Sequence, residues 1–335
     1  MIQDFNHYKL FATQASVIIM APIPTGILTD PIFLEHKTGM HPEKPERLLA
    51  ILALLQENPL WEKLIKVSAK PAKIDDIYLV HEPNYVKSLE KQIKSGVDYV
   101  YTPDCSVSPQ TFEVAQMAVG GAIQLIEMVL DGDLKNGLGL VRPPGHHAEK
   151  DCAMGFCYFN NIAICAEFLI KKRGLEKILI VDFDVHHGNG TQHFFEDRQD
   201  VFYVSIHQSP ISCYPGTGYA EETGSGEGKG YTLNVPMPPG ADDTSYLKAL
   251  EEILIPAWSK YDPDFVMISA GFDAHRKDPL AQISITEKTY RAFIKELVAL
   301  AKRSCDGKLV SLLEGGYNLQ VIPGLVLAHL EEMVV

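Results

Sequence analysis

The sequence has 335 residues, of which 43 are acidic and 30 basic, giving a formal net charge of -13. This balance argues against a protein that binds duplex DNA or RNA, since such proteins rely on basic patches, and it favours cationic ligands instead. Apolar residues make up 46% and charged residues 22%, which is typical of a globular protein with a large core.

Neither the cysteines nor the apolar runs indicate an extracellular or membrane protein. The six cysteines form no C-x-x-C pair, so we expect reduced thiols and a cytoplasmic location. No apolar run approaches the ~20 residues of a membrane span, so we expect no membrane contact. We interpret residues 1–24 as an N-terminal extension and residues 25–335 as a single domain, because no linker rich in glycine, proline or serine divides them.

From there on, short apolar segments alternate with longer segments of helical pattern. We expect strands at 26–30, 137–141, 177–184, 201–207, 231–237, 264–271 and 308–316. We expect helices at 42–59, 108–133, 160–174, 242–261 and 284–304. Apolar strands alternating with helices predict an α/β fold, in which a parallel sheet is covered by helices on both faces.

Capping residues predict the ends of three helices. Ser108 is the expected N-cap of the second helix, with Pro109 in its first turn. Gly174 should end the third helix, because glycine often follows the last helical residue. Ser284 and Glu287 have the spacing of a capping box at the start of the last helix.

Polar residues directly follow five of the expected strands, in the segments RPPGHHAEKD, DFDVHHGNG, SIHQSPISCYPGTG, SAGFDAH and LLEGGYN. Ligand sites in parallel α/β folds lie outside the carboxyl ends of the strands. We therefore expect these five segments to meet at one edge of the sheet and to form a site there.

The segment DFDVHHGNG carries the first candidate metal ligands. Asp182, Asp184 and His186 share one face if the strand stays extended through them, because strand side chains alternate. A hydrogen-bonded Asp–His pair is the more common explanation of an Asp-x-His spacing alone. Asp273, at another strand end, favours a metal, because three protein ligands and an open position make a catalytic zinc site. Fe²⁺ or Co²⁺ also suits this ligand set, and His275 competes with Asp273 on spacing.

Three further residues offer acid–base and oxyanion chemistry. The adjacent His146 and His147 make a poor chelate but a suitable acid–base pair, because imidazole titrates near neutral pH. Asp182 and Asn189 are available to orient these rings through their second nitrogens. Tyr317 follows two glycines and could donate its hydroxyl to a substrate carbonyl. Ordinary loop histidines and a packing tyrosine are the alternatives for each residue taken alone.

In this order, RPPGHHA, GFCYFNN, VDFDVHHGNGTQ, YPGTG, SAGFDAH and LLEGGYN resemble the motifs of the histone deacetylase superfamily. That group includes bacterial deacetylase-like amidohydrolases and acetylpolyamine amidohydrolases. The resemblance runs from about Thr25 to near the C-terminus. It implies a three-layer, arginase-like α/β fold with a central eight-stranded parallel sheet and helices on both faces.

The resemblance implies a role for each matching residue. It implies one catalytic Zn²⁺ per chain, with the ligands Asp184, His186 and Asp273. The residues that match the catalytic groups are His146, His147, Asp182, Asn189 and Tyr317. In this pattern Asp182 supports His146, Asn189 faces His147, and the Tyr317 hydroxyl polarises the substrate carbonyl.

The resemblance also implies a narrow acyl-lysine tunnel and bound potassium. The residues that match the tunnel and its surroundings are Gly155, Phe156, Tyr214, Leu280, Asp104 and Arg47. Among them, Asp104 would grip the substrate backbone at the rim. A structural K⁺ near the zinc would be held around Asp182, Asp184, His186 and Ser205, and a second monovalent ion would lie near 195–201.

Two positions indicate which branch of this group the chain resembles. Asn189 stands where one major eukaryotic branch has aspartate. An asparagine at this position resembles the class II-type and bacterial members. Leu280 stands where the polyamine-specialised branch has glutamate, which removes one argument for polyamine substrates. We therefore expect a zinc-dependent amide hydrolase that removes acetyl or another short acyl group from lysine side chains of proteins or peptides. The alternatives are a deacetylase of acetylated polyamines or other small acylated amines, a non-enzymatic ligand-binding homologue, and a binuclear hydrolase of the arginase type.

Overall fold

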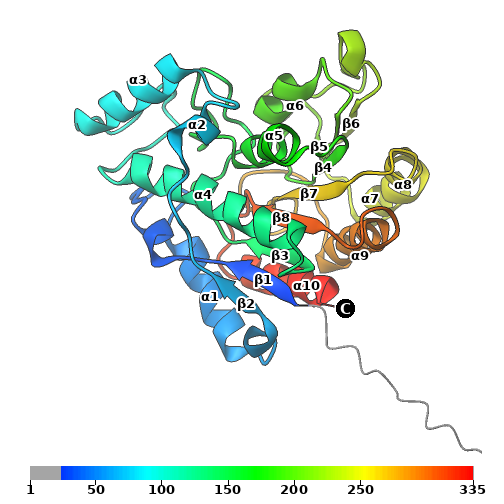
Figure 1. Cartoon of the computed structure of the whole chain (residues 1–335). Coiled ribbons are helices and arrows are strands. Elements are labelled where there is room, and N and C mark those ends of the chain that lie inside the picture. The colour runs from blue at the N-terminus through cyan, green and yellow to red at the C-terminus, as the bar shows by residue number, and fades with distance from the viewer. Residues whose placement is uncertain (1–23, 335) are drawn as a thin grey trace, which may run out of the picture.

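A computed structural model describes residues 24–334 and arranges them around one parallel sheet (Figure 1). The predicted N-terminal extension lies outside the described residues, apart from Pro24. The strand order is β2-β1-β3-β8-β7-β4-β5-β6, and every neighbouring pair is parallel. The strands are β1 (Thr25–Leu28), β2 (Ile65–Val67), β3 (Asn136–Gly139), β4 (Ile178–Asp182), β5 (Val201–Gln208), β6 (Thr232–Met237), β7 (Phe265–Ala270) and β8 (Leu309–Leu313).

Helices cover both faces of the sheet, as the sequence predicts. On one face α4 and α5 pack against each other, and on the other α10 packs between α1 and α9 (Figure 1). The helices are α1 (Glu46–Glu57), α2 (Ile74–Ile77), α3 (Pro83–Lys94), α4 (Thr111–Leu130), α5 (Asn161–Arg173), α6 (Asn189–Phe195), α7 (Asp243–Ala249), α8 (Ile255–Trp258), α9 (Glu287–Ser304) and α10 (Ile322–Met333).

Every residue of the central strands β3, β8, β7, β4 and β5 is buried. Such strands carry no alternation of apolar and polar residues, because helices cover both of their faces. Their rigid hydrogen-bonded ladders fix the positions at which the following loops begin. The edge strand β2 is different: two of its three residues are exposed, and it is not among the predicted strands.

The α4 helix begins later than predicted. Its first residue is Thr111 and its N-cap is Gln110, so Ser108 and Pro109 lie outside it. The reason is a tertiary contact: the Ser108 hydroxyl donates to the backbone carbonyl of Glu35 at 3.1 Å. The Ser108 oxygen also accepts the backbone N–H of Lys37 at 3.2 Å, so the backbone groups that it binds lie in a distant segment and not in the first turn of α4.

The capping box predicted at Ser284 is also wrong. The α9 helix begins at Glu287 with Thr286 as N-cap, whereas Ser284 forms an isolated β-bridge with Asp242. The carboxylate of Asp243 accepts hydrogen bonds from the Thr286 backbone N–H at 2.8 Å and the Thr286 hydroxyl at 2.7 Å. A side chain from α7 therefore anchors the start of α9, which local sequence spacing cannot reveal.

The helix predicted over 242–261 is divided. A π-helical turn, Leu250–Leu254, separates α7 from α8. Pro256 lies in the first turn of α8 and has no N–H to donate, so the regular pattern of hydrogen bonds cannot run through it.

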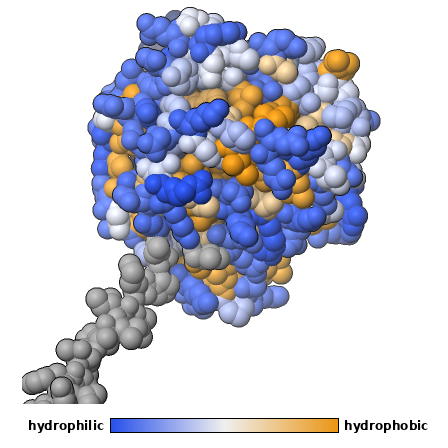
Figure 2. Space-filling view, turned by 90° about the vertical axis from the view of Figure 1, so that its right-hand side faces the viewer, coloured by the Kyte–Doolittle hydropathy of each residue, from blue (hydrophilic) through white to orange (hydrophobic). Residues whose placement is uncertain are grey.

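Of the described helices, only α4 is long and apolar enough to cross a membrane, and 61% of its most apolar window is buried inside the protein. Burial of this extent is typical of a core helix. The face shown in Figure 2 is mainly hydrophilic, with apolar residues gathered near its centre.

Candidate active site

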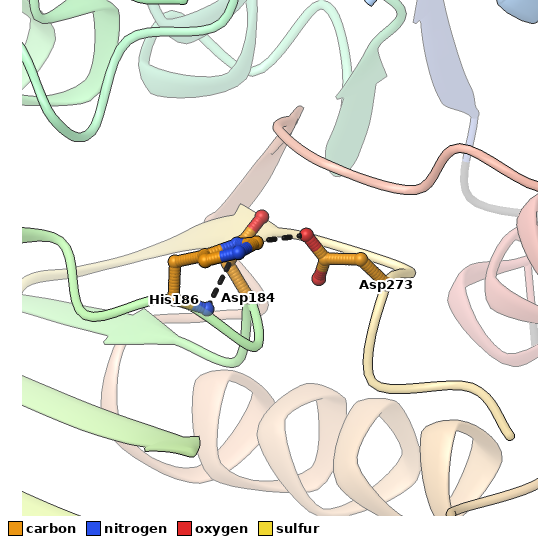
Figure 3. Close-up of side chains that lie close together, drawn as sticks. All are labelled: Asp184, His186 and Asp273. Atoms are coloured by element: carbon orange, nitrogen blue, oxygen red, sulfur yellow. Dashed lines mark hydrogen bonds and ion pairs between the residues drawn. The ribbon is translucent and has the colours of Figure 1, made fainter. Parts of the chain in front are cut away.

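The three predicted metal ligands lie together at the carboxyl ends of two neighbouring strands. Asp184 and His186 follow β4, and Asp273 follows β7, which pairs with β4. One ligand atom from each residue lies within 4.8 Å of the other two (Figure 3). The Nδ1 atom of His186 is 3.1 Å from Asp184 Oδ1 and 3.2 Å from Asp273 Oδ2.

The chain does not stay extended through these residues. Strand β4 ends at Asp182. The Oδ1 atom of Asp182 accepts the backbone N–H of Asp184 at 3.1 Å. Asp184 Oδ1 likewise accepts the N–H of His186 at 2.9 Å. Each carboxylate holds the backbone two residues further on, as aspartate does in Asx turns. The ligands therefore converge through turns and not through the alternation of a strand.

Backbone groups fix the second oxygens of the carboxylates. Asp184 Oδ2 accepts the N–H of Gly315 at 2.8 Å, from the loop after β8. Asp273 Oδ1 accepts the N–H of Val185 at 2.9 Å. These hydrogen bonds orient both side chains before any ion binds, which is the arrangement a metal site requires.

The chemistry of this ligand set fits a divalent cation. Burial and the nearby charge of Asp184 raise the pKa of Asp273, because two adjacent buried carboxylates cannot both ionise cheaply. A bound cation would remove this conflict and would suit the imidazole nitrogen as well. His275 is half-buried and lies outside the cluster, and its Nδ1 accepts the backbone N–H of Lys277 at 3.2 Å.

His146 and His147 are buried beside this cluster, with ring centroids 4.0 Å apart. His146 Nδ1 is 3.0 Å from Asp182 Oδ2, and His147 Nδ1 is 2.7 Å from Asn189 Oδ1. The structure thus pairs each histidine with the partner that the sequence indicated. The catalytic roles of all four residues remain predictions.

The two histidines have opposite pKa shifts. Burial alone would lower the pKa of His146, but the negative charges of Asp182, Asp184 and Glu314 raise it to about 10. Burial and the neighbouring His146 lower the pKa of His147 well below its usual range. Environments that push two neighbouring pKa values apart are characteristic of acid–base pairs.

Tyr317 lies in the loop after β8, and two groups hold its ring. The ring centroid is 5.9 Å from that of Phe156 and 5.0 Å from the guanidinium carbon of Arg47. Burial, followed by the charge of Asp273, raises the pKa of the Tyr317 hydroxyl well above its usual value. The hydroxyl therefore stays protonated and can act as a hydrogen-bond donor.

Aromatic rings lie around the histidines and Tyr317. The Tyr214 ring is 5.0 Å from that of His147, and Tyr214 is 41% exposed, so it reaches from the site to solvent. Gly155 precedes Phe156, and a Cβ atom at Gly155 would lie 2.3 Å from the His147 ring. Only glycine allows the backbone to approach the histidine this closely.

Asp104 and Leu280 lie on two further loops of the predicted substrate channel. Asp104 Oδ2 accepts the N–H of Gly155 at 3.1 Å, and its buried Oδ1 has no hydrogen-bond partner among the described residues. Leu280 is 37% exposed, and its N–H donates to Asp278 Oδ1 at 3.1 Å. Contact of Asp104 and Leu280 with the substrate stays a prediction.

Arg47 is completely buried and belongs to an ion-pair cluster that the sequence analysis missed. Its guanidinium donates to Glu43 Oε1 at 3.1 Å and to the backbone carbonyl of Gly316 at 2.7 Å. Glu43 also binds Arg142, whose Nε is 2.5 Å from Oε1. Burial opposes ionisation of Glu43, but the two arginines lower its pKa to about 2. This cluster supports the loop that carries Tyr317.

Glu314 and Asp278 were also missed. Glu314 is buried after β8 and accepts the backbone N–H groups of Gly145 at 2.8 Å and His146 at 3.3 Å, while burial raises its pKa to about 7. Asp278 accepts the N–H of Tyr317 at 2.7 Å. The signal for Glu314 was present, because a carboxylate between an apolar strand and two glycines matches the pattern that singled out Asp182.

Two of the four predicted potassium residues, Asp184 and His186, belong to the metal cluster itself. Asp182 and Ser205 are directly opposite each other on β4 and β5, and the Ser205 hydroxyl is 2.7 Å from His207 Nδ1. His187, next to the predicted ligand His186, is buried and has other partners. Its two ring nitrogens each lie 2.8 Å from a partner, Thr217 Oγ1 and Gln192 Oε1.

Comparisons with known proteins agree on one family. Residues 41–333 match the family described as histone deacetylase domain. A probable deacetylase of Archaeoglobus fulgidus is 40% identical, over 88% of this chain and 82% of the relative. A histone deacetylase-like amidohydrolase of Pseudomonas aeruginosa is 37% identical, over 88% of this chain and 77% of the relative. The crystal structure of the HDA15 HD domain superposes with a TM-score of 0.87 at 38% identity, covering 94% of this chain and 89% of that one.

A relative of different specificity also matches. The human polyamine deacetylase HDAC10 is 38% identical, over 83% of this chain but only 42% of the relative. Deacetylases of more than one substrate class are therefore similar to this chain to comparable degrees.

Proposed function

The chain belongs to the histone deacetylase family, and we propose that it is a zinc-dependent deacetylase of acetylated lysine side chains in proteins or peptides. The observation that carries the proposal is the cluster of Asp184, His186 and Asp273 beside the buried His146–His147 pair. A ligand-binding homologue would not require two histidines with opposite pKa shifts next to a metal-binding cluster.

Removal of an acetyl group from an amine requires water to add to the amide carbonyl and the C–N bond to break. A divalent cation on the three ligands would supply Lewis-acid polarisation of the carbonyl and of water. His147, whose pKa is lowered by burial, accepts the proton of the attacking water as general base. His146, which keeps its proton, protonates the departing amine. The products are a free amine and a carboxylate.

Tyr317 stabilises the negative charge that develops on the carbonyl oxygen. Its hydroxyl stays protonated, and its backbone is anchored by Asp278 at 2.7 Å. A donor fixed before reaction needs no reorganisation when charge appears, which is why such groups contribute strongly to catalysis.

Several finer features belong to the same proposal. A structural potassium ion would lie around Asp182, Asp184, His186 and Ser205. The apolar and aromatic side chains of Phe156, Tyr214 and Leu280 would surround the lysine methylene groups, and Asp104 would hold the substrate backbone. The six free cysteines suit a reducing compartment, which supports a cytoplasmic location.

A substrate panel on protein loaded with a defined metal tests the proposal. We expect the zinc-loaded protein to hydrolyse an acetyl-lysine peptide with a higher kcat/KM than acetylputrescine or acetylspermidine. A strong preference for the small amines would instead establish the polyamine alternative. Inactivity towards every short acyl amide, with one zinc bound per chain, would refute catalysis altogether.

A further inference from the structure

Asn189, the partner of His147, is the first residue of α6, and one turn later the same helix carries His193. Residues four positions apart lie on the same face of a helix. Glu149, three residues after His146, lies against this face of α6. Its Oε1 is 2.6 Å from Asn189 Nδ2 and 2.8 Å from His193 Nδ1.

The contacts of Asn189 determine which way its amide points. The Nδ2 atom lies near three acceptors: Glu149 Oε1 at 2.6 Å, the His147 carbonyl at 3.3 Å and Met154 Sδ at 3.4 Å. An amide oxygen at this position would face three groups that cannot donate to it. The amide oxygen must therefore face His147, and the carboxylate of Glu149 is the closest group enforcing this choice.

The amide orientation in turn selects the tautomer of His147. An amide oxygen only accepts, so Nδ1 of His147, 2.7 Å away, must carry the proton. The other ring nitrogen, Nε2, is then left with a free lone pair. A flipped amide would place a donor against Nδ1, and the neutral ring would carry its proton on Nε2, where it could not act as a base.

We propose that Glu149 is a positioning residue that fixes the Asn189 amide and so keeps Nε2 of His147 unprotonated, while His193 holds Glu149 in place. This assignment rests on the proposed function of His147 as general base. Glu149 itself lies outside the catalytic cluster, with 21% of its side chain exposed, and lines a surface pocket of about 630 Å³ together with His193 and Asp197. It acts only through Asn189.

Two substitutions separate orientation from charge. Glu149→Ala removes the acceptor and should lower kcat about 10-fold or more, the scale for groups that orient catalytic histidines, with little change in KM. Glu149→Gln keeps a side-chain oxygen that can accept from Asn189 Nδ2, so we expect kcat within about threefold of the original protein. Asp197→Asn, which removes a negative charge from the same pocket, should leave kcat unchanged.

The tautomer can be read without activity. In long-range ¹H–¹⁵N NMR spectra of the zinc-loaded protein, His147 should show the Nδ1–H pattern in the original protein and in Glu149→Gln. In Glu149→Ala the pattern should become that of mixed tautomers. Assignment uses the signals lost in His147→Gln, and thermal melting with zinc analysis confirms that each variant is folded and loaded.

Two results with the Glu149 variants would contradict the role proposed for this residue. An unchanged His147 pattern and kcat in Glu149→Ala would overturn the proposal, and so would an equal loss in Glu149→Gln, since charge would then matter and not orientation. Should Glu149→Ala fail to fold, His193→Ala carries the test, with a smaller loss of kcat in the same direction expected and no loss overturning it. If the protein hydrolyses no acyl amide, the NMR spectra still decide the role of Glu149.

Discussion

The Tyr317 side chain is held by residues from widely separated parts of the chain. Arg47 comes from α1, Phe156 from the loop after His147, and Asp278 from the loop after β7. Only the folded sheet brings these segments together. The hydroxyl they position is the only part of the ring that the proposed mechanism uses, so removing it tests the role without disturbing the packing.

We expect Tyr317→Phe to lower kcat about 100-fold or more, because it removes one oxyanion donor while leaving the ring in place. Steady-state kinetics with zinc analysis measure this effect. Tyr261→Phe is the matched control, since its hydroxyl donates to the Gln199 carbonyl at the opposite edge of the sheet. Full activity of zinc-loaded Tyr317→Phe would exclude the proposed role.

His329 is a buried histidine without a hydrogen-bond partner for either ring nitrogen among the described residues. Burial lowers its pKa from 6.5 to about 3, and its ring packs against Phe183 and Phe272. At a pH between these two pKa values, His329 binds a proton in the unfolded chain but not in the folded protein. His329 therefore reduces stability progressively as the pH falls below about 6.5.

We expect His329→Leu to weaken the pH dependence of stability between about pH 6.5 and 4. Each histidine of this kind contributes a slope of about 1.4 kcal/mol per pH unit in that range. Urea unfolding of metal-free protein at several pH values measures the slope. Phe293→Leu, which truncates another ring packed on Phe183, should leave the slope unchanged. Equal slopes for His329→Leu and the original protein would disprove this explanation.

At the scale of elements, the long helix α4 owes its position to a close approach between backbones. A Cβ atom at Gly120 would lie 1.9 Å from the Lys70 carbonyl oxygen and 2.3 Å from the Ala72 nitrogen. The segment after β2 thus passes directly over α4. Helix propensity alone favours alanine over glycine at such a position, so here tertiary packing outweighs local preference.

Gly120→Ala should destabilise the protein by about 3 kcal/mol, at the upper end for overpacking, because the backbone it meets cannot move aside easily. Gly324→Ala in α10 is the matched control: a Cβ there would meet nothing within 4 Å. That change should be neutral or stabilise by up to about 1 kcal/mol. Urea unfolding compares the two, and equal effects would show that the contact over α4 is not restrictive.

At the scale of the whole molecule, the proposed metal links β4, β7 and the loop after β8. Its ligands lie in the loops after β4 and β7, and the Gly315 N–H after β8 anchors Asp184. An ion that binds only the folded protein stabilises it, by about 2.7 kcal/mol when its free concentration is 100 times its Kd. Catalysis and global stability should therefore depend on the same ion.

We expect a chelator to abolish deacetylation and lower Tm, and one equivalent of Zn²⁺ to restore both. Calorimetry and activity assays on the same samples measure the two effects together. In Asp184→Asn the chelator should change Tm little, because the site has already lost a ligand. Full activity after verified removal of the metal would contradict the dependence on a cation.

Much of this protein was predictable from local sequence. Apolar strands alternating with helices predicted the parallel sheet, and polar residues directly after those strands predicted its functional edge, because side chains at the ends of parallel strands must meet. The ordered motifs predicted the family. The resemblance to the family paired His146 with Asp182 and His147 with Asn189, and both pairs lie within hydrogen-bonding distance.

Tertiary structure alone decided the rest. Ser108 and Ser284 do not cap helices because distant partners, the Glu35 carbonyl and the Asp243 carboxylate, determine those helix ends. The choice of Asp273 over His275 depends on which side chain lies with Asp184 and His186 in the folded protein. Glu314 and Glu149 make their contacts at the site with residues far away in the sequence. The chain specifies which chemical groups are available, and only the folded sheet determines which of them come within hydrogen-bonding distance.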